Sequence, residues 1–268
     1  MKVYGVVSLC CGLGGHALGL LRARSDAGSR FESVGAFDLD EAACRDFKLL
    51  TGAEATPLDL AVAQPSDLAS RCTRRPDVVI MSAPCQGFSG CLPESRAAEP
   101  HYQDLNAIAL RCIDLALEAW PVPPAMILFE NVPRITARGR ELLERIIALL
   151  RGKGYLIDAH THDCGEIGGL AQRRQRYLLV ARHPDLAPHQ LMRPPAQALR
   201  AMADVLWPLP VPTRVLPSAR RTATPASSSR LESPVISRPS RPVPAKTRAM
   251  VTSCTARPRP AARNQVRR

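Results

Sequence analysis

The residues best suited to chemistry are a cysteine, a glutamate and two arginines that stand at the borders of apolar runs. Cys85 follows a short β-branched run and a proline, Glu130 ends a second run, and Arg174 and Arg176 open a third. A thiolate is a nucleophile, a carboxyl group can hold or protonate a substrate nitrogen, and a guanidinium pairs with carbonyl or phosphate oxygens. The plainer interpretations are a packing thiol, a surface acid at a strand end and a solvated cationic strand edge.

The elements that must position these residues alternate along the chain. β-Branched runs predict strands, and apolar residues at helical spacing predict helices. Strands are expected at 3–9, 33–40, 55–60, 77–81, 124–130, 155–161 and 172–181, helices after Gly15 and at 41–50, 105–120 and 139–150, and a flexible loop at 165–171. This order is typical of an α/β fold, whose chemistry gathers beyond the carboxyl ends of parallel strands. Cys85 and Glu130 should therefore meet at one edge of the sheet.

A glycine-rich turn and the acids after it predict a cofactor site at the same edge. Glycines at a strand-to-helix turn let a cofactor approach the backbone and the free amides of the helix. Gly12, Gly14 and Ala17 satisfy G-x-G-x-x-A, so a dinucleotide-binding fold is an open alternative. Asp38, with Asp40 as the second choice, is placed to accept the ribose hydroxyls of an adenosine cofactor. Each acid has the alternative role of a helix cap or solvated turn.

The composition separates a globular part from a basic tail. The chain has 268 residues with 46% hydrophobic content, no apolar run that could span a bilayer and no signal-peptide pattern, which favours a cytoplasmic globular protein. Residues 211–268 hold thirteen Lys and Arg against Glu232 alone, while 23 basic and 23 acidic residues cancel in 1–210. The net charge of +12 therefore describes the tail, which is rich in Pro, Ser and Arg and is predicted to be disordered.

The cysteines and histidines do not predict a metal site. Nine cysteines are an odd number without a C-x-x-C pair, so reduced thiols are expected rather than a disulfide framework or zinc ribbon. His160, His162 and Cys164 alternate and would share one face of a strand. No fourth ligand stands near them in the sequence, so a polar strand face is favoured over a metal centre.

Four blocks, in order over residues 3–182, resemble the conserved blocks of the cytosine-5 DNA methyltransferase family. They are Ser8-Leu9-Cys10-Cys11-Gly12-Leu13-Gly14-Gly15, Ala83-Pro84-Cys85-Gln86-Gly87-Phe88-Ser89, Glu130-Asn131-Val132, and the Q-x-R-x-R pattern of Gln172, Arg174 and Arg176. One block is a weak signal, whereas four in the family's order are specific. The chain departs from the family at Cys10, where phenylalanine is usual, at Ala83, which replaces a frequent proline, and in the longer loop at 165–171.

The resemblance implies a Rossmann-like class I methyltransferase sheet with helices on both faces, S-adenosylmethionine as cofactor, and DNA as the partner whose target cytosine is flipped into the pocket. It implies that Cys85 adds to carbon 6 of cytosine, that Glu130 holds or protonates ring nitrogen 3, and that Arg174 or Arg176 contacts the base oxygen and orients the thiolate. Asp38 would take the ribose, Asp59 with Leu60 the adenine amino edge, and the glycine turn the methionine portion. The implied cofactor contacts are Cys10, Gly12, Leu13, Gly14, Gly15, Asp38, Leu39, Asp59, Leu60 and Pro84. The implied substrate contacts are Gln86, Ser89, Asn131 and Gln172.

The C-terminal part departs from the family more strongly. The family continues with a target-recognition domain and two closing motifs, and neither is recognisable after residue 182. We expect a catalytic domain at 1–185, a remnant or linker at 186–210 and the tail at 211–268. The change of composition near Pro210 resembles an out-of-frame segment. The hypothesis is a methyltransferase impaired by C-terminal truncation, with a second chain as one source of a recognition domain. The open alternatives are a tRNA cytosine-5 methyltransferase of the same family, a nicotinamide-dependent dehydrogenase, and a non-enzymatic remnant or half of a split enzyme.

Overall fold

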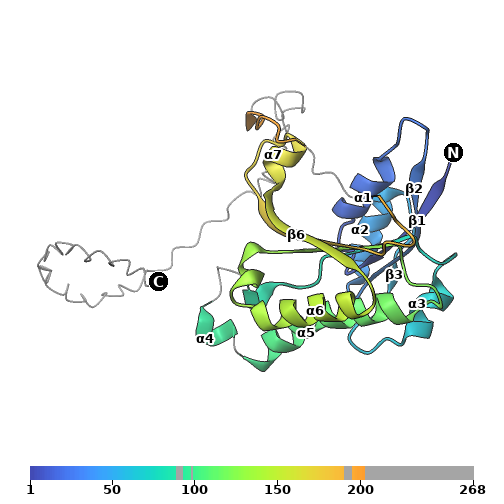
Figure 1. Ribbon diagram of the computed structural model, residues 1–268. Helices are drawn as coiled ribbons and strands as arrows, with labels where there is room; N and C mark the ends of the chain where they lie inside the picture. Colours follow the sequence, from blue (N-terminus) through green and yellow to red (C-terminus); the bar gives the residue numbers. More distant parts are fainter. Residues whose placement is uncertain (89–92, 98, 190–194, 203–268) are drawn as a thin grey trace, which may run out of the picture. The chain divides into compact units, whose positions relative to one another are not determined.

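One seven-stranded mixed sheet organises the chain. The computed structural model describes residues 1–88, 93–97, 99–189 and 195–202, all within the unit Met1–Pro212. The strands are β1 (Val3–Leu9), β2 (Arg30–Asp38), β3 (Thr56–Pro57), β4 (Val78–Met81), β5 (Met126–Asn131), β6 (Leu156–Asp163) and β7 (Gln175–Arg182), in the order β3-β2-β1-β4-β5-β7-β6 (Figure 1). Strands β1 to β5 pair in parallel, whereas β7 is antiparallel to both β5 and β6. The start of β7 therefore lies at the edge where β4 and β5 end.

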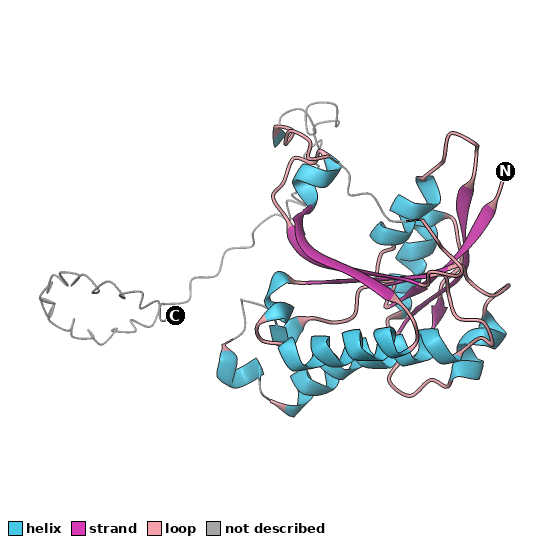
Figure 2. Ribbon diagram, viewed as in Figure 1, coloured by secondary structure: helices cyan, strands magenta, loops and turns pink. Residues whose placement is uncertain are grey.

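Helices cover both faces of this sheet, as predicted. Figure 2 shows α5 and α6 along one face and α1 and α2 on the other. The helices are α1 (Gly15–Arg22), α2 (Glu41–Thr51), α3 (Pro65–Arg71), α4 (Glu94–Ala97), α5 (Pro100–Glu118), α6 (Arg140–Gly152) and α7 (Cys164–Gly168), with 3-10 turns η1 (Gln86–Phe88) and η2 (Pro133–Thr136). The alternation of strands and helices confirms the predicted α/β class.

The core follows the two-residue period of the strands. Val7 and Val79 are fully buried in the larger cluster, which α5 and α6 cover. Their neighbours Val6 and Val78 point to the opposite face and pack with Leu20 of α1 in a smaller cluster. Alternate side chains of one strand thus reach two apolar layers, which explains why the predicted strands read as continuous apolar runs.

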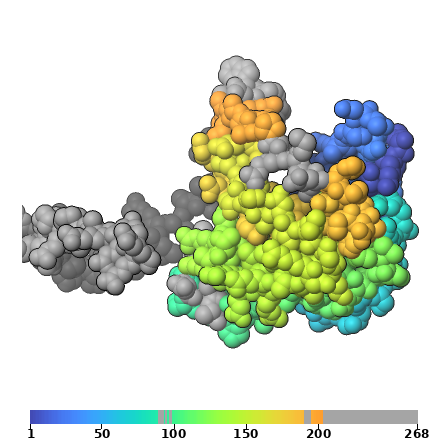
Figure 3. Space-filling model, viewed as in Figure 1, coloured from blue at the N-terminus to red at the C-terminus, as the bar shows by residue number. Residues whose placement is uncertain are grey.

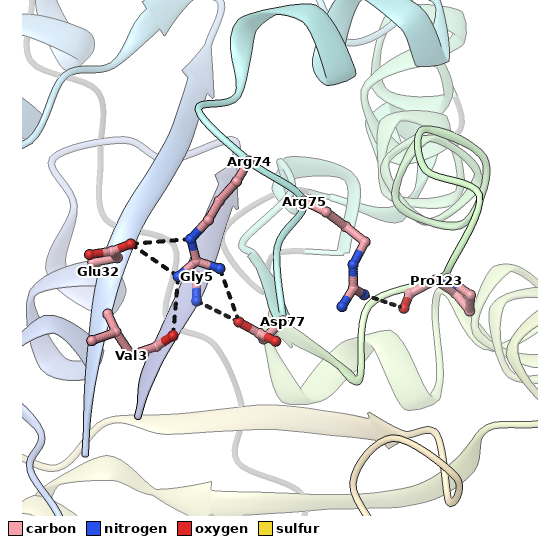
Figure 4. A network of polar contacts seen from close by, with 7 residues as sticks. All are labelled: Val3, Gly5, Glu32, Arg74, Arg75, Asp77 and Pro123. Carbon is pink, nitrogen blue, oxygen red and sulfur yellow. Dashed lines mark hydrogen bonds and ion pairs between the residues drawn. The ribbon is translucent and has the colours of Figure 1, made fainter. Parts of the chain in front are cut away.

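An arginine network ties the sheet together at the amino edge, opposite the predicted site. Arg74 donates to Glu32 Oε1 at 3.0 Å, to Asp77 Oδ2 at 3.3 Å and to the Val3 carbonyl at 3.2 Å. Asp77 in turn accepts from the Gly5 amide at 2.8 Å (Figure 4). One guanidinium therefore joins β1, β2 and the segment that enters β4.

The predicted flexible loop at 165–171 is wrong in part, because α7 occupies its first half. Asp163 caps this helix by accepting from the Gly165 amide at 2.9 Å, and Gly169 ends it with φ of 59°. The segment 195–202 packs on it, since the Gln197 amide donates to the Glu166 carbonyl at 2.7 Å (Figure 3).

Several other boundaries differ from the predictions. The strand expected at 55–60 is reduced to two residues, β7 begins three residues later than expected, and α3 was not predicted. Helix α5 begins at Pro100 rather than near residue 105, because proline is well suited to the first turn of a helix.

Some predictions concern residues outside the described ranges. They include the substrate contact of Ser89 and the disordered tail at 211–268, and the domain boundaries stay predictions. Within the described ranges, every helix is too short or too polar to cross a membrane.

Candidate active site

Cys85 lies on the loop that leaves β4 at the carboxyl edge of the sheet, as predicted. The Phe88 amide donates to the Cys85 carbonyl at 3.0 Å and closes the turn η1 directly after the cysteine. This turn packs on α5 through Gly87, where an added Cβ would stand 2.5 Å from Nδ2 of the buried Asn106. The close approach fixes the loop, so the half-buried thiol has a defined place.

Glu130, next to last in β5, is buried and held at both carboxylate oxygens. Its Oε1 pairs with Arg176 Nε at 2.7 Å, and its Oε2 accepts from the Ser82 hydroxyl at 2.5 Å. The adjacent Asn131 is buried, and its Oδ1 accepts from the Val132 amide while its Nδ2 has no partner in the described part of the chain. Paired charges of this kind are well ordered because breaking the pair would leave a buried charge uncompensated.

The two predicted arginines occupy different environments. Arg176, the second residue of β7, lies against Glu130 with 20% of its side chain exposed. Arg174 precedes β7 and is exposed, and its amide donates to Asp163 Oδ1 at 3.1 Å. Strand β7 begins between these two positions, so Arg176 belongs to the strand and Arg174 to the segment that precedes it. Gln172 is also exposed, ahead of the strand.

The charged groups around Cys85 have opposite effects on the pKa of its thiol. Burial raises the pKa of the Cys85 thiol, and the negative charge of Glu130 raises it further. The positive charges of Arg176 and Arg174 lower it. The net effect is a raised pKa, so the ease with which Cys85 forms a thiolate depends on the balance between burial, one acid and two arginines.

A cavity of about 560 Å³ adjoins the cysteine. It is large enough for a small organic cofactor. Its walls include eight predicted contacts, Cys10, Gly12, Asp38, Leu39, Asp59, Leu60, Pro84 and Gln86, together with Cys85. Leu13, Gly14 and Gly15 were also predicted to contact the cofactor, and they lie outside this wall. Sequence reasoning missed Leu58, Ser82, Leu105 and Ile108, which also line it, because apolar and small residues carry no chemical signal of their own.

Asp38 organises the turn at the far end of the cavity. Its Oδ2 accepts from the Gly12 amide at 2.9 Å and its Oδ1 from the Asp40 amide at 3.1 Å. Each carboxylate oxygen has a second lone pair, so these bonds leave acceptor capacity for a hydroxyl in the cavity. Cys10, with φ of 49°, brings its Sγ within 3.8 Å of the buried Cys112 Sγ. The turn is therefore held from both sides before any ligand binds.

The predicted histidine group borders the site, because His162 of β6 is in register with Arg176 of β7. His160 and His162 lie on the edge strand β6, with their ring centroids 6.0 Å apart, and His160 Nε2 is 2.7 Å from Asp158 Oδ1. Cys164 belongs to α7 instead of the strand. No group of three His, Cys, Asp or Glu side chains in the described ranges is arranged to hold a metal ion.

The fold and this edge define a Rossmann-like sheet with Cys85 beside a cavity of about 560 Å³. A profile of the family described as C-5 cytosine-specific DNA methylase matches residues 4–226. The chain belongs to this family, which confirms the resemblance drawn from the four sequence blocks. Enzymes of the family are methyltransferases, a class that generally uses S-adenosylmethionine.

Known relatives agree with this placement. The chain is 29% identical to the Type II methyltransferase M.AplI of Arthrospira platensis over 181 residues, and 29% identical to M.XorII of Xanthomonas oryzae pv. oryzae over 183 residues. These alignments cover 66% of this chain in both cases, but 45% and 40% of the relatives, so the chain spans less than half of their length. The solved structure of the Entamoeba histolytica methyltransferase EhMeth shares the fold, with a TM-score of 0.56, 22% identity, and coverage of 74% of this chain and 58% of that one.

Proposed function

We propose that this chain transfers a methyl group from S-adenosylmethionine to carbon 5 of cytosine in DNA. The observation that carries the proposal is the meeting of Cys85, Glu130 and Arg176 at one edge of the sheet, beside a cavity of cofactor size. The family and the Type II methyltransferases among its relatives support DNA as the substrate and a role in restriction and modification. Because the chain spans less than half of those relatives, the activity needs a direct test.

The chemistry assigns a separate task to each side chain. Carbon 5 of cytosine is a poor nucleophile, so the Cys85 thiolate forms a bond to carbon 6 while Glu130 protonates ring nitrogen 3. The electrons of the carbon 5–carbon 6 double bond are thereby made available at carbon 5, which would take the methyl group as its bond to the cofactor's sulfur breaks and the demethylated cofactor leaves. Loss of the carbon 5 proton to solvent then restores the double bond and expels Cys85 as a thiolate, and ring nitrogen 3 returns its proton to Glu130. Since this addition requires an unpaired ring edge, the target base must be flipped out of the duplex.

The arginines support the charged steps. Arg176 holds Glu130 and favours the thiolate of Cys85, and Arg174 adds a second positive charge from the start of β7. A guanidinium that contacts the base oxygen would also stabilise the charge that builds on the ring during addition. Gln86, Asn131 and Gln172 are the proposed polar contacts to the substrate at the same edge.

The cavity suits the proposed cofactor, which supplies an electrophilic methyl group when bound. The carboxylate of Asp38 can accept ribose hydroxyls in addition to its two backbone donors. Asp59 lines the same cavity and is the proposed partner of the adenine amino group, and the exposed Leu39 and buried Leu60 are the proposed apolar contacts of the ring. The turn from Gly12 to Gly15 is the proposed contact for the methionine portion, because glycines let a ligand approach the backbone closely.

Methyl transfer from labelled S-adenosylmethionine to duplex DNA by the purified chain tests the proposal. Cys85→Ala should abolish incorporation, whereas Cys72→Ala, a matched change of a half-buried thiol after α3, should leave it unchanged. Incorporation that survives Cys85→Ala would refute the proposal. A parallel arm with tRNA separates the two nucleic acids. The predicted impairment of DNA selection is contradicted if methylation is confined to one short sequence.

A further inference from the structure

Ser82, the first residue after β4, lies between the cavity and Glu130. It lines the cavity, and its hydroxyl donates to Glu130 Oε2 at 2.5 Å. The contact follows from the pairing of β4 with β5, because Met81 is in register with Phe129 and the next position on each chain is Ser82 and Glu130. The geometry of the sheet, rather than a chance side-chain conformation, brings the hydroxyl to the carboxylate.

The hydroxyl completes a two-point hold on Glu130. Arg176 Nε binds one carboxylate oxygen at 2.7 Å, and Ser82 binds the other. Two hydrogen bonds to different oxygens fix the rotation of the carboxylate plane, whereas one bond leaves the plane free to turn. Ser82 therefore determines which way the second oxygen of Glu130 points.

A hydroxyl is suited to a carboxyl group that must change its protonation state. Arginine can only donate, so it favours the ionised carboxylate. The neutral serine hydroxyl can donate to Oε2 when the carboxylate is ionised, and to a remaining lone pair of Oε2 when that oxygen carries the proton for ring nitrogen 3. The same residue can thus hold Glu130 before and after a proton has moved.

We propose that Ser82 is a positioning residue that keeps Oε2 of Glu130 aimed at ring nitrogen 3 of the flipped cytosine in both protonation states of the carboxyl group. This inference rests on the proposed methyl transfer. A serine that only capped the strand would stabilise the fold, and its loss would reduce the amount of folded protein without a specific effect on turnover.

The first test compares Ser82→Ala and Ser82→Thr in the full chain, with Ser70→Ala as a control. Ser70 lies on α3, where its hydroxyl bonds the Asp67 carbonyl at 3.3 Å, away from the site. One readout is methyl transfer, and the other is release of tritium from carbon 5 of cytosine in DNA without cofactor, since addition of Cys85 alone labilises that position.

Loss of a hydrogen bond to a charged group should lower kcat about ten- to a hundredfold in Ser82→Ala. KM for DNA should change by less than about twofold, because the bond acts on the reacting group and not on DNA binding. Ser82→Thr should recover most of the rate, and Ser70→Ala should match the unsubstituted chain. An unaltered kcat in Ser82→Ala, or a threonine variant as slow as the alanine variant, overturns the inference.

A crystal structure of Ser82→Ala gives an answer that does not depend on turnover. We expect the carboxylate plane of Glu130 to rotate about its contact with Arg176. A carboxylate that keeps both oxygens in place overturns the inference even if the chain is inactive. Conversely, equal rates of methyl incorporation by the unsubstituted chain and Cys85→Ala refute the proposed methyl transfer. The crystal structure of Ser82→Ala then still shows whether Ser82 orients the carboxylate of Glu130.

Discussion

Replacing Gly14 by alanine should destabilise the protein by about 1–4.5 kcal/mol, the net of two separable costs and one smaller gain. Gly14 has φ of 85°, a left-handed conformation that costs an alanine about 1–2 kcal/mol. An added Cβ would also stand 2.7 Å from Phe47 Cδ2 and 2.9 Å from Thr51 Cγ2, an overpacking worth about 1–3 kcal/mol. The lower conformational entropy of the unfolded alanine chain reduces the net destabilisation by about 0.4–1 kcal/mol.

Two other glycines separate these costs. Gly52 has φ of 74° and open space around its added Cβ, so Gly52→Ala should cost only about 1 kcal/mol. Gly19, inside α1, has neither a positive φ nor a close neighbour, so Gly19→Ala should stabilise the protein by about 0.5–1 kcal/mol.

The free energy of unfolding of all three variants can be measured by urea denaturation without cofactor. The expected order, from most to least stable, is Gly19→Ala, the unsubstituted chain, Gly52→Ala and Gly14→Ala. If Gly14→Ala is no less stable than Gly52→Ala, the contact with Phe47 is not tight, and the glycine is required for another reason, such as access of the cofactor.

Three further predictions concern charge and burial. Because burial and Glu130 raise the pKa of Cys85, alkylation of this thiol by iodoacetamide should be slow at neutral pH and become faster as the pH rises. Glu130→Gln should lower that pKa and shift the increase in alkylation rate to lower pH. Mass spectrometry can follow the alkylation, and a pH profile unchanged in Glu130→Gln contradicts this prediction. Arg74→Met should cost about 1 kcal/mol at low salt and less at high salt, because its network is partly exposed; equal losses at both salt concentrations would show that packing dominates. Tyr155→Phe should cost about 1–2 kcal/mol in thermal unfolding, since its buried hydroxyl donates to the Pro124 carbonyl at 2.6 Å, and a neutral substitution would mean that water replaces it.

The strands at the centre of the sheet were predictable because their residues face two apolar layers. Val3–Leu9 has the predicted bounds, and β4 differs by one residue. Helix α7 was not predictable in the same way, because it is five residues long and depends on a cap at Asp163 and on contacts with the segment 195–202. Helix α3 did carry a signal, since Pro65 and Asp67 stand at positions typical of a first helical turn.

The candidate site likewise has features that the sequence predicts and features that depend on strand pairing. That Cys85 and Glu130 lie close enough to interact followed from two strand ends, and the pKa of Cys85 reflects that proximity. The contact of Ser82 with Glu130 required the register of β4 against β5, which no sequence pattern specifies. The different surroundings of Arg174 and Arg176 depended on where β7 begins. Residue type thus predicted the chemistry, and strand pairing decided the partners.

The antiparallel direction of β7 has a consequence for the synthesis of the protein. Cys85 and Glu130 leave the ribosome before the hairpin of β6 and β7, and until that hairpin pairs with β5 the buried carboxylate has no guanidinium partner. During this interval β5 is an unprotected sheet edge, the kind of surface at which nascent chains associate wrongly. Docking of β6 and β7 therefore covers the edge of β5 and brings Arg176 to Glu130 in the same folding step.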